Sequence, residues 1–210
     1  MADPLLLDIG CGRGNDLHKW NELGVSRVVG IDNHQESLEE ARVRMEKKGG
    51  RTKCEFVLGD VNEVGLCELV PDVYRGKIDI VTFNFAFHYV KNPLECVESV
   101  SRLLVAGGVF VGVCSDGDVI SKNLDGVQRF EEGGVVVEAV GLNQYSFVLR
   151  GGDSNFYFEF RDVPCEYFVY KKSMLDMLER SGFGEICIRS LSTEASPWGK
   201  YYFSWFARKK

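Results

Sequence analysis

The first half of the chain alternates short apolar runs with segments of helical spacing, and this alternation constrains the fold more than any other feature. Short apolar runs predict buried strands, and glycine or proline marks the ends of several helical segments. Strands are expected at residues 5–9, 27–31, 54–58, 78–85 and 109–113, and helices at 16–23, 37–48 and 93–104. Repeated strand–helix units join parallel strands through right-handed crossovers. The sequence therefore predicts an α/β fold with a mostly parallel sheet flanked by helices.

The pattern changes after Cys114, where β-type segments replace the strand–helix units. Further strands are expected at residues 135–140, 145–149 and 156–160, followed by a helix at 171–181 and a terminal strand pair at 185–189 and 201–207. Glycine- and asparagine-containing turns separate the first of these segments, as in β-hairpins. We expect residues 1–210 to form a single domain, with a β-rich insertion at approximately 115–165 that covers the substrate pocket at the open end of the sheet.

Charge and composition narrow the classes of function. The formal net charge is −6, whereas proteins that bind long nucleic acids through their phosphates are usually basic. If the substrate is a nucleic acid, we expect recognition at a local pocket. No apolar stretch approaches the roughly 18 residues of a membrane helix, and the first residues lack the basic and apolar regions of a signal peptide. We therefore expect an intracellular protein that has no membrane partner.

The cysteines and histidines argue against a disulfide framework and a metal site. Seven cysteines are an odd number, and most of them lie among apolar residues, as reduced and buried cysteines do. The sequence has no Cys-x-x-Cys pair and only three histidines, so a zinc site is not expected.

A glycine-rich segment, Asp8-Ile9-Gly10-Cys11-Gly12-Arg13-Gly14, directly follows the first expected strand. Its glycines allow a sharp turn and a close approach of the backbone to a ligand. The spacing is Gly-x-Gly-x-Gly, which differs from the Gly-x-Gly-x-x-Gly of dinucleotide-binding proteins. Asp32 ends the next strand, where a carboxylate can accept hydrogen bonds from both ribose hydroxyls, and Asp60 follows the third. The alternative is an ordinary turn with solvent-exposed acids.

This segment resembles motif I of class I S-adenosylmethionine-dependent methyltransferases. The resemblance implies a Rossmann-like fold with a mostly parallel seven-stranded sheet, and S-adenosylmethionine as the cofactor. It further implies the roles of the cofactor-binding residues. The loop with Gly10 and Gly12 would hold the methionine part, Asp8 its amino group, Asp32 the ribose and Asp60 the adenine amino group.

Several later segments resemble the mRNA cap guanine-N7 methyltransferases, in order and across nearly the whole chain. The matching segments are residues 7–17 with Lys19-Trp20, Phe83-Asn84-Phe85-Ala86-Phe87-His88-Tyr89, residues 115–120, Val163-Pro164-Cys165-Glu166-Tyr167-Phe168-Val169 and Tyr201-Tyr202. Most members of that family have glutamine at the position of Asn84, which is expected at the cofactor, and they lack one residue before the glutamate. The resemblance implies methyl transfer to N7 of the guanine cap of 5′-capped mRNA.

The chemistry of this reaction suits the residues present. Guanine N7 has a lone pair and no proton, so the transfer needs positioning but neither a general acid or base nor a metal. The resemblance implies that Glu166 accepts hydrogen bonds from guanine N1–H and N2–H, while His88 and Tyr89 contact the guanine edge and O6. Tyr202 would pack on the base or bond to the cap. Arg13 and Arg44 match positions that carry basic residues toward the triphosphate.

Each assignment has an alternative. His88 could be a core histidine, Glu166 a paired structural carboxylate and Arg44 a solvated surface residue. Tyr201 and Tyr202 alternate along a strand, so one of them is expected in the core. The alternative functions are a small-molecule or protein methyltransferase of the same fold, and a non-catalytic methyltransferase-like subunit.

Family members usually have a segment before the first strand that this sequence lacks. We therefore expect a minimal or shortened form, or a piece of a larger capping polypeptide. Other capping-enzyme domains or a stimulatory subunit could complete the pocket. The expected location is the nucleus for a cellular protein and the cytoplasm for a viral one.

Overall fold

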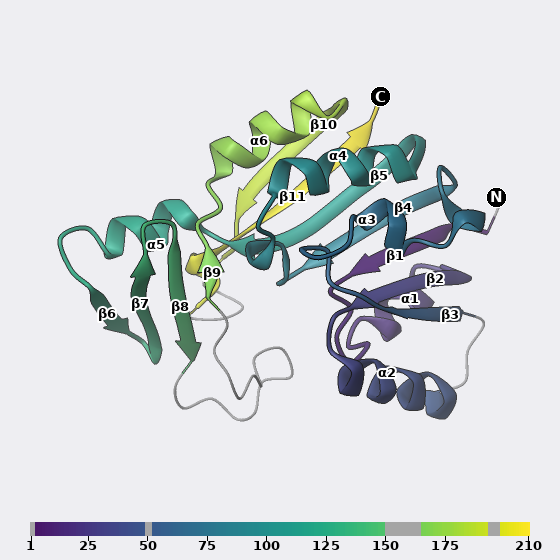
Figure 1. Cartoon of the computed structure of the whole chain (residues 1–210), viewed down its shortest axis with the longest axis horizontal. Helices are drawn as coiled ribbons and strands as arrows, with labels where there is room; N and C mark the ends of the chain where they lie inside the picture. The colour runs from purple at the N-terminus through teal and green to yellow at the C-terminus, as the bar shows by residue number, and fades with distance from the viewer. Residues whose placement is uncertain (1–2, 49–51, 150–164, 193–197) are drawn as a thin grey trace.

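A seven-stranded sheet with the order β10-β11-β5-β4-β1-β2-β3 forms the centre of the computed structural model, which describes residues 3–48, 52–149, 165–192 and 198–210 (Figure 1). Its strands are β1 (Leu5–Ile9), β2 (Arg27–Asp32), β3 (Lys53–Leu58), β4 (Ile78–Asn84), β5 (Leu104–Ser115), β10 (Phe183–Ser190) and β11 (Tyr202–Lys209). Strands β1 to β5 are parallel to one another, and β11 is antiparallel to both β5 and β10. The predicted α/β fold with a mostly parallel sheet is confirmed.

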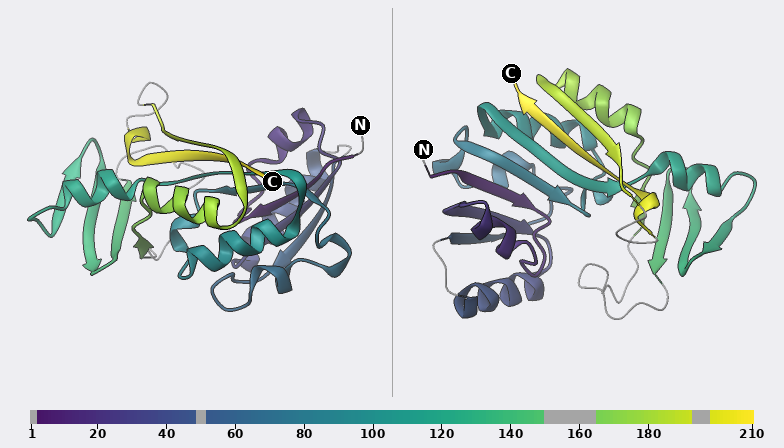
Figure 2. Two further views of the ribbon diagram at one scale, coloured as in Figure 1. Left: turned by 90° about the horizontal axis from the view of Figure 1, so that it is seen from above. Right: turned by 180° about the vertical axis from the view of Figure 1, so that it is seen from behind.

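Helices cover both faces of this sheet, so the residues of β1 are buried on both sides. The helices are α1 (Leu17–Glu22), α2 (Gln35–Lys48), the short α3 (Leu66–Leu69), α4 (Pro93–Leu103) and α6 (Lys171–Arg180). Leu5, Leu7 and Ile9 belong to the main core, which includes residues of α4 and α6. Leu6 faces the opposite way and packs with Leu17 and Trp20 of α1. The view from above in Figure 2 shows α4 and α6 on one side of the sheet and α1 on the other.

A second, antiparallel sheet with the order β6-β7-β8-β9 forms the insertion after β5. Its elements are the helix α5 (Gly117–Asn123) and the strands β6 (Arg129–Glu132), β7 (Val135–Gly141), β8 (Gln144–Leu149) and β9 (Glu166–Tyr167). In Figure 1 this sheet lies beyond the end of β5, away from β1 to β3. A separate core containing Ile120, Val137, Phe147 and Tyr202 joins it to the end of β11. The predicted β-rich insertion is therefore present.

Some elements differ from the prediction. Helix α5 was not expected, because Gly117 and the β-branched Val119 and Ile120 are weak helix formers, but Asp116 caps the helix by accepting from the Asp118 N–H. Strand β6 was missed because half of its residues are glutamates. Strand β5 begins at Leu104, directly after α4, and not at residue 109 as expected. The strand expected at 156–160 lies outside the described residues.

The described residues also form the short 3-10 helices η1 (Asp72–Tyr74), η2 (Phe87–Tyr89) and η3 (Gly199–Tyr201). The C-terminal strand fits beside β5 because Gly112 leaves room for Trp205. A Cβ atom at Gly112 would lie 2.2 Å from the Trp205 ring and 2.4 Å from the Phe83 carbonyl oxygen. Within the described ranges, no helix is long and apolar enough to cross a membrane.

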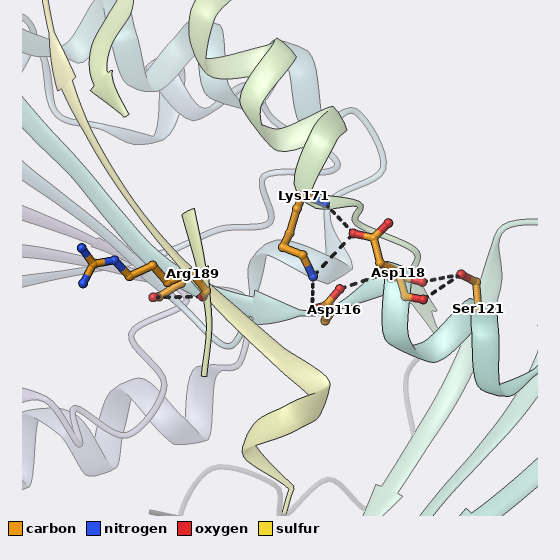
Figure 3. Close-up of polar contacts among 7 residues, drawn as sticks. Asp116, Asp118, Ser121, Lys171 and Arg189 are labelled. Atoms are coloured by element: carbon orange, nitrogen blue, oxygen red, sulfur yellow. Dashed lines mark hydrogen bonds and ion pairs between the residues drawn. The ribbon is translucent and has the colours of Figure 1, made fainter. Parts of the chain in front are cut away.

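Polar contacts among Asp116, Asp118 and Lys171, which we call the base clamp, hold the two ends of the insertion together (Figure 3). The Lys171 ammonium forms an ion pair with the fully buried Asp116 and lies 3.6 Å from Asp118 Oδ2. The Lys171 backbone N–H also donates to Asp118 Oδ2, at 3.1 Å. Beside these contacts, the Gly117 N–H donates to the Val169 carbonyl at 2.9 Å. The chain therefore enters α5 and returns to α6 at one place.

Candidate active site

The glycine loop after β1 has the backbone conformation that its sequence requires. Gly10, Gly12 and Gly14 all have positive φ, at 69°, 50° and 66°, a region that side chains with a Cβ rarely adopt. A Cβ atom at Gly10 would lie 2.5 Å from the Ala86 Cβ. The loop therefore lies directly against the segment that follows β4. Strands β4 and β2 flank β1 on opposite sides, and such a switch point is where open α/β sheets bind ligands.

Asp32, at the end of β2, organises this loop. Its Oδ2 accepts a hydrogen bond from the Gly12 N–H at 2.8 Å, and its Oδ1 accepts one from the His34 N–H at 3.0 Å. Burial raises the pKa of Asp32, while these backbone donors lower it. Each carboxylate oxygen has two lone pairs, so both retain capacity for a further donor.

Asp8 is a second buried acid at the end of β1, only 3% exposed. Its Oδ1 accepts a hydrogen bond of 2.6 Å from the Thr82 hydroxyl. Burial raises the pKa of Asp8 to about 8, and the charges of Asp16 and Asp32 add to this effect. The Asn84 amide donates to Asp16 at 3.0 Å, which brings the end of β4 into the same cluster. Three carboxyl groups so close together favour a cationic ligand.

Asp60 lies half-buried after β3 and links the turn after β2 to η2 through hydrogen bonds. Its Oδ2 accepts from the Asn33 amide at 3.1 Å, and its Oδ1 accepts from the Asn62 N–H at 2.8 Å. The Asn62 side chain in turn donates to the Tyr89 carbonyl at 3.0 Å. The position of η2 is thereby tied to the turn that carries Asp60.

A strained turn leads from β4 into η2. Phe85 has a positive φ of 56°, which is uncommon for a residue other than glycine and is found at functional sites. Its N–H donates to the Val113 carbonyl at 2.8 Å. This turn buries Phe87 in the main core and places His88 and Tyr89 beside β9.

His88 is 1% exposed, and burial lowers its pKa to about 3. Its Nδ1 accepts a hydrogen bond of 3.4 Å from the Ser115 N–H. The ring is therefore neutral with its proton on Nε2. This nitrogen lies 3.7 Å from Glu166 Oε2, beyond hydrogen-bond distance.

Glu166 is 5% exposed and faces His88 and Tyr89 from the insertion. Its Oε1 accepts a weak hydrogen bond of 3.5 Å from the Tyr89 hydroxyl. Its Oε2 is buried and has no hydrogen-bond partner among the residues that the structure describes. Burial raises the pKa of Glu166 to about 7, against hydrogen bonds from Tyr145, Ser115 and Tyr89 that lower it. A buried acceptor without a partner is costly unless a ligand supplies the donor.

The structure thus brings together His88, Tyr89 and Glu166 from segments far apart in the sequence. Tyr202 is also buried, and its ring lies 5.3 Å from that of Phe85. Tyr201 and Tyr202 do not alternate along one strand as expected, because Tyr201 ends η3 and Tyr202 begins β11. Both are 1% exposed, since the insertion covers this end of β11.

Arg13 belongs to the glycine loop and Arg44 to α2. Arg13 Nε is 3.4 Å from a carboxylate oxygen of Glu40, and the Arg44 guanidinium donates to the Asn15 side chain. Their contact with a triphosphate stays a prediction.

Ser115 and Tyr145 were missed by sequence reasoning. Ser115 ends β5, and Tyr145 lies directly opposite Glu166 in the pairing of β8 with β9. No motif marks Tyr145, and its proximity to Glu166 follows only from the register of the second sheet.

The sheet order, with its antiparallel β11 between β5 and β10, and the glycine loop with an acid ending β2 define the fold of class I methyltransferases. Solved structures agree: an S-adenosylmethionine-dependent methyltransferase from Mesorhizobium loti has a TM-score of 0.67 at 20% identity, covering 99% of this chain and 91% of that one. One from Clostridium acetobutylicum has a TM-score of 0.68 at 18% identity, covering 100% of this chain and 85% of that one.

The chain belongs to the mRNA (guanine-N(7))-methyltransferase domain family, whose model matches residues 2–188.

Curated relatives of this chain are named as mRNA cap guanine-N(7) methyltransferases. The mRNA cap guanine-N(7) methyltransferase of Schizosaccharomyces pombe is 36% identical over 124 residues, or 57% of this chain, and mRNA cap guanine-N(7) methyltransferase 1 of Arabidopsis thaliana is 34% identical over 146 residues, or 64%. The matches span 34% and 39% of the lengths of these relatives. The family resemblance in the sequence is confirmed.

Proposed function

We propose that this chain transfers a methyl group from S-adenosylmethionine to N7 of the guanine cap of 5′-capped mRNA. The observation that carries the proposal is the buried Glu166 carboxylate, whose Oε2 has no hydrogen-bond partner among the described residues. Beside it lies the neutral Nε2–H of His88, a donor. An acceptor and a donor side by side match the N1–H and O6 of guanine.

The residues around the glycine loop fit the cofactor. A Cβ atom at Gly12 would meet nothing within 4 Å, so the loop has open space beside it. Asp32 retains acceptor capacity for the ribose hydroxyls, and Asp60 would accept from the adenine amino group. Asp8 would face the amino group of the methionine part, directly or through water, and Asn84 would line the same site. When bound, S-adenosylmethionine supplies a methyl group on a positively charged sulfur.

The acid cluster favours this ligand for a further reason. Without a cation, burial keeps the pKa of Asp8 near 8, so that the carboxyl is largely protonated at neutral pH. An ammonium group beside it would favour the ionised form. The site is therefore better suited to a cationic ligand than to a phosphate-bearing one.

The chain's contribution to the reaction is to hold guanine in place. N7 carries no proton, so no side chain needs to act as a base. Glu166 would accept from N1–H and N2–H, and His88 and Tyr89 would fix the guanine edge. Positive charge develops on the purine during transfer, so a carboxylate at the far edge stabilises the transition state more than the ground state. Tyr202 would pack near the base, and Arg13 and Arg44 would lie toward the triphosphate.

Residues 115–165 would cover this pocket as part of the single domain 1–210. Other capping-enzyme domains or a stimulatory subunit are further expected partners. We expect the protein to act inside the cell, in the nucleus for a cellular enzyme and in the cytoplasm for a viral one.

The test is cap methylation by Glu166→Gln. The substitution preserves shape but replaces a pure acceptor by a group that both donates and accepts. Methylation of GpppRNA should fall by up to ~100-fold, equivalent to about 2.7 kcal/mol of charge-assisted hydrogen bonding. Cofactor affinity, measured by calorimetry, should not change. Glu138→Gln, at an exposed glutamate on β7, is the matched control.

His88→Ala is the companion variant, because it removes the proposed donor to O6. Parental methylation rates in both the Glu166 and His88 variants would overturn the cap assignment. A small-molecule or protein methyltransferase of the same fold would then be the better description.

A further inference from the structure

Two buried hydroxyl groups lie behind the Glu166 carboxyl, on the end of β5 and on β8. The Tyr145 hydroxyl donates to Ser115 Oγ at 2.5 Å. Both residues are fully buried, and Tyr145 lies directly opposite Glu166 in the pairing of β8 with β9. Because Tyr145 donates its proton to Ser115, the Ser115 proton is left to point toward the carboxyl group, and both hydroxyls lower the pKa of Glu166. They therefore form a small network with the carboxyl group proposed to select guanine.

The network can reduce the cost of ionising the buried Glu166. An ionised carboxylate in an apolar setting is costly unless hydrogen-bond donors stabilise it. Tyr89 donates to Glu166 only at 3.5 Å, which is a weak bond. Tyr145 and Ser115 lower the pKa of Glu166 more than Tyr89 does. The cross-strand position of Tyr145 and its hydrogen bond to Ser115 therefore place this pair to stabilise the ionised form.

We propose that Ser115 and Tyr145 are positioning residues that keep Glu166 ionised and aimed, so that its unpartnered oxygen faces the guanine edge. This inference rests on the proposed function of Glu166 as the guanine acceptor. Tyr145 is suited to the task because it is the cross-strand partner of Glu166 in the second sheet. Ser115 is suited because its own N–H also fixes the ring of His88.

The ionisation of Glu166 can be followed through the acidic limb of the pH profile of kcat/KM. The titratable groups that face the Glu166 carboxyl are His88 and Tyr89 from η2, Cys114 from β5, Tyr145 from β8 and Tyr202 from β11. Burial keeps His88 neutral and raises the pKa values of the tyrosines and the cysteine, so all of them are neutral near pH 7. Among them, Glu166 alone titrates near pH 7.

The experiment measures kcat/KM for GpppRNA against pH in Tyr145→Phe and Ser115→Ala. Loss of a donor raises the pKa of Glu166 further, so the midpoint of the acidic limb should move to higher pH by roughly one unit. At pH 7 the ionised fraction of Glu166 would fall from about one half to about one tenth, so kcat/KM should fall roughly fivefold, while cofactor affinity stays the same. Ser115→Thr retains the hydroxyl and should restore both values.

Tyr201→Phe is the matched control. Tyr201 is equally buried in the second core, but its hydroxyl donates to Glu132 at 2.8 Å. Its removal should leave the acidic limb in place. If the limb stays unmoved in Tyr145→Phe and Ser115→Ala as well, while Glu166→Gln is impaired, the two hydroxyls serve packing only and the inference is wrong. If Glu166→Gln and His88→Ala both keep full activity, the proposed function fails instead.

Discussion

Asp32 performs two tasks, since its carboxylate fixes the glycine loop and remains able to accept from a ligand. The hydrogen bonds to Gly12 and His34 use one lone pair on each oxygen. The loop is consequently shaped before any cofactor binds. Preorganisation of this kind reduces the entropy that binding must offset.

Asp32→Ala should weaken binding of S-adenosylmethionine by about 1–3 kcal/mol, because the buried ribose hydroxyls lose their acceptor. Calorimetry on the folded variant measures the change. Asp176→Ala, at an exposed position on α6, should bind as the parent does. Unchanged affinity in Asp32→Ala would mean that the ribose lies elsewhere.

The cofactor side of the site could be predicted from the sequence, while the network around Glu166 could not. Gly10, Gly12 and Asp32 are positioned by local rules, namely a tight turn and the end of the neighbouring strand. Tyr145 reaches Glu166 through strand pairing in the second sheet, and Ser115 approaches it from the end of β5 in the first sheet. The register of these strands depends on how the whole insertion packs, and no local sequence pattern predicts it.

Among the elements, the parallel strands followed the hydrophobic pattern closely, whereas the β5–β11 pairing could not be foreseen. The pairing aligns Gly112 with Trp205, and the fit depends on the absence of a side chain at Gly112. The sequence indicated that a terminal strand pair exists. Its place beside β5 is a property of packing between distant segments.

The base clamp connects two elements, because its contacts join the start of α5 to the start of α6. Lys171→Met would leave the carboxylate of Asp116 buried without its cation, which typically costs about 3–5 kcal/mol. Denaturant unfolding should show this loss of stability, and the double variant Asp116→Asn/Lys171→Met should recover part of it.

Lys172→Met is the control for the clamp, since Lys172 is the exposed neighbour. Its effect should stay within about 0.5 kcal/mol. Equal losses in the Lys171 and Lys172 variants would show that the ion pair adds nothing to stability.

At the scale of the whole molecule, the proposed substrate is an anion, whereas the chain itself is acidic. With a net charge of −6, few cations are free to follow a phosphate backbone. We therefore expect affinity for capped RNA to depend on the cap and hardly on RNA length.

Fluorescence anisotropy with short and long capped RNAs over a series of salt concentrations tests this expectation. The two lengths should bind alike, and the logarithmic salt slope should correspond to no more than about three phosphate contacts. A slope several times steeper, or a marked preference for the longer RNA, would contradict it.

The base clamp also has a consequence for how such a protein can diverge. Because residues 117–170 leave and rejoin the fold at a single point, their length is nearly independent of the main sheet. Doubling a closed loop of this kind costs only about 0.6 kcal/mol in chain entropy. Insertions and deletions in this segment can therefore accumulate and reshape the side proposed to select the methyl acceptor. The glycine loop lies outside the segment, so such changes in length leave its conformation intact.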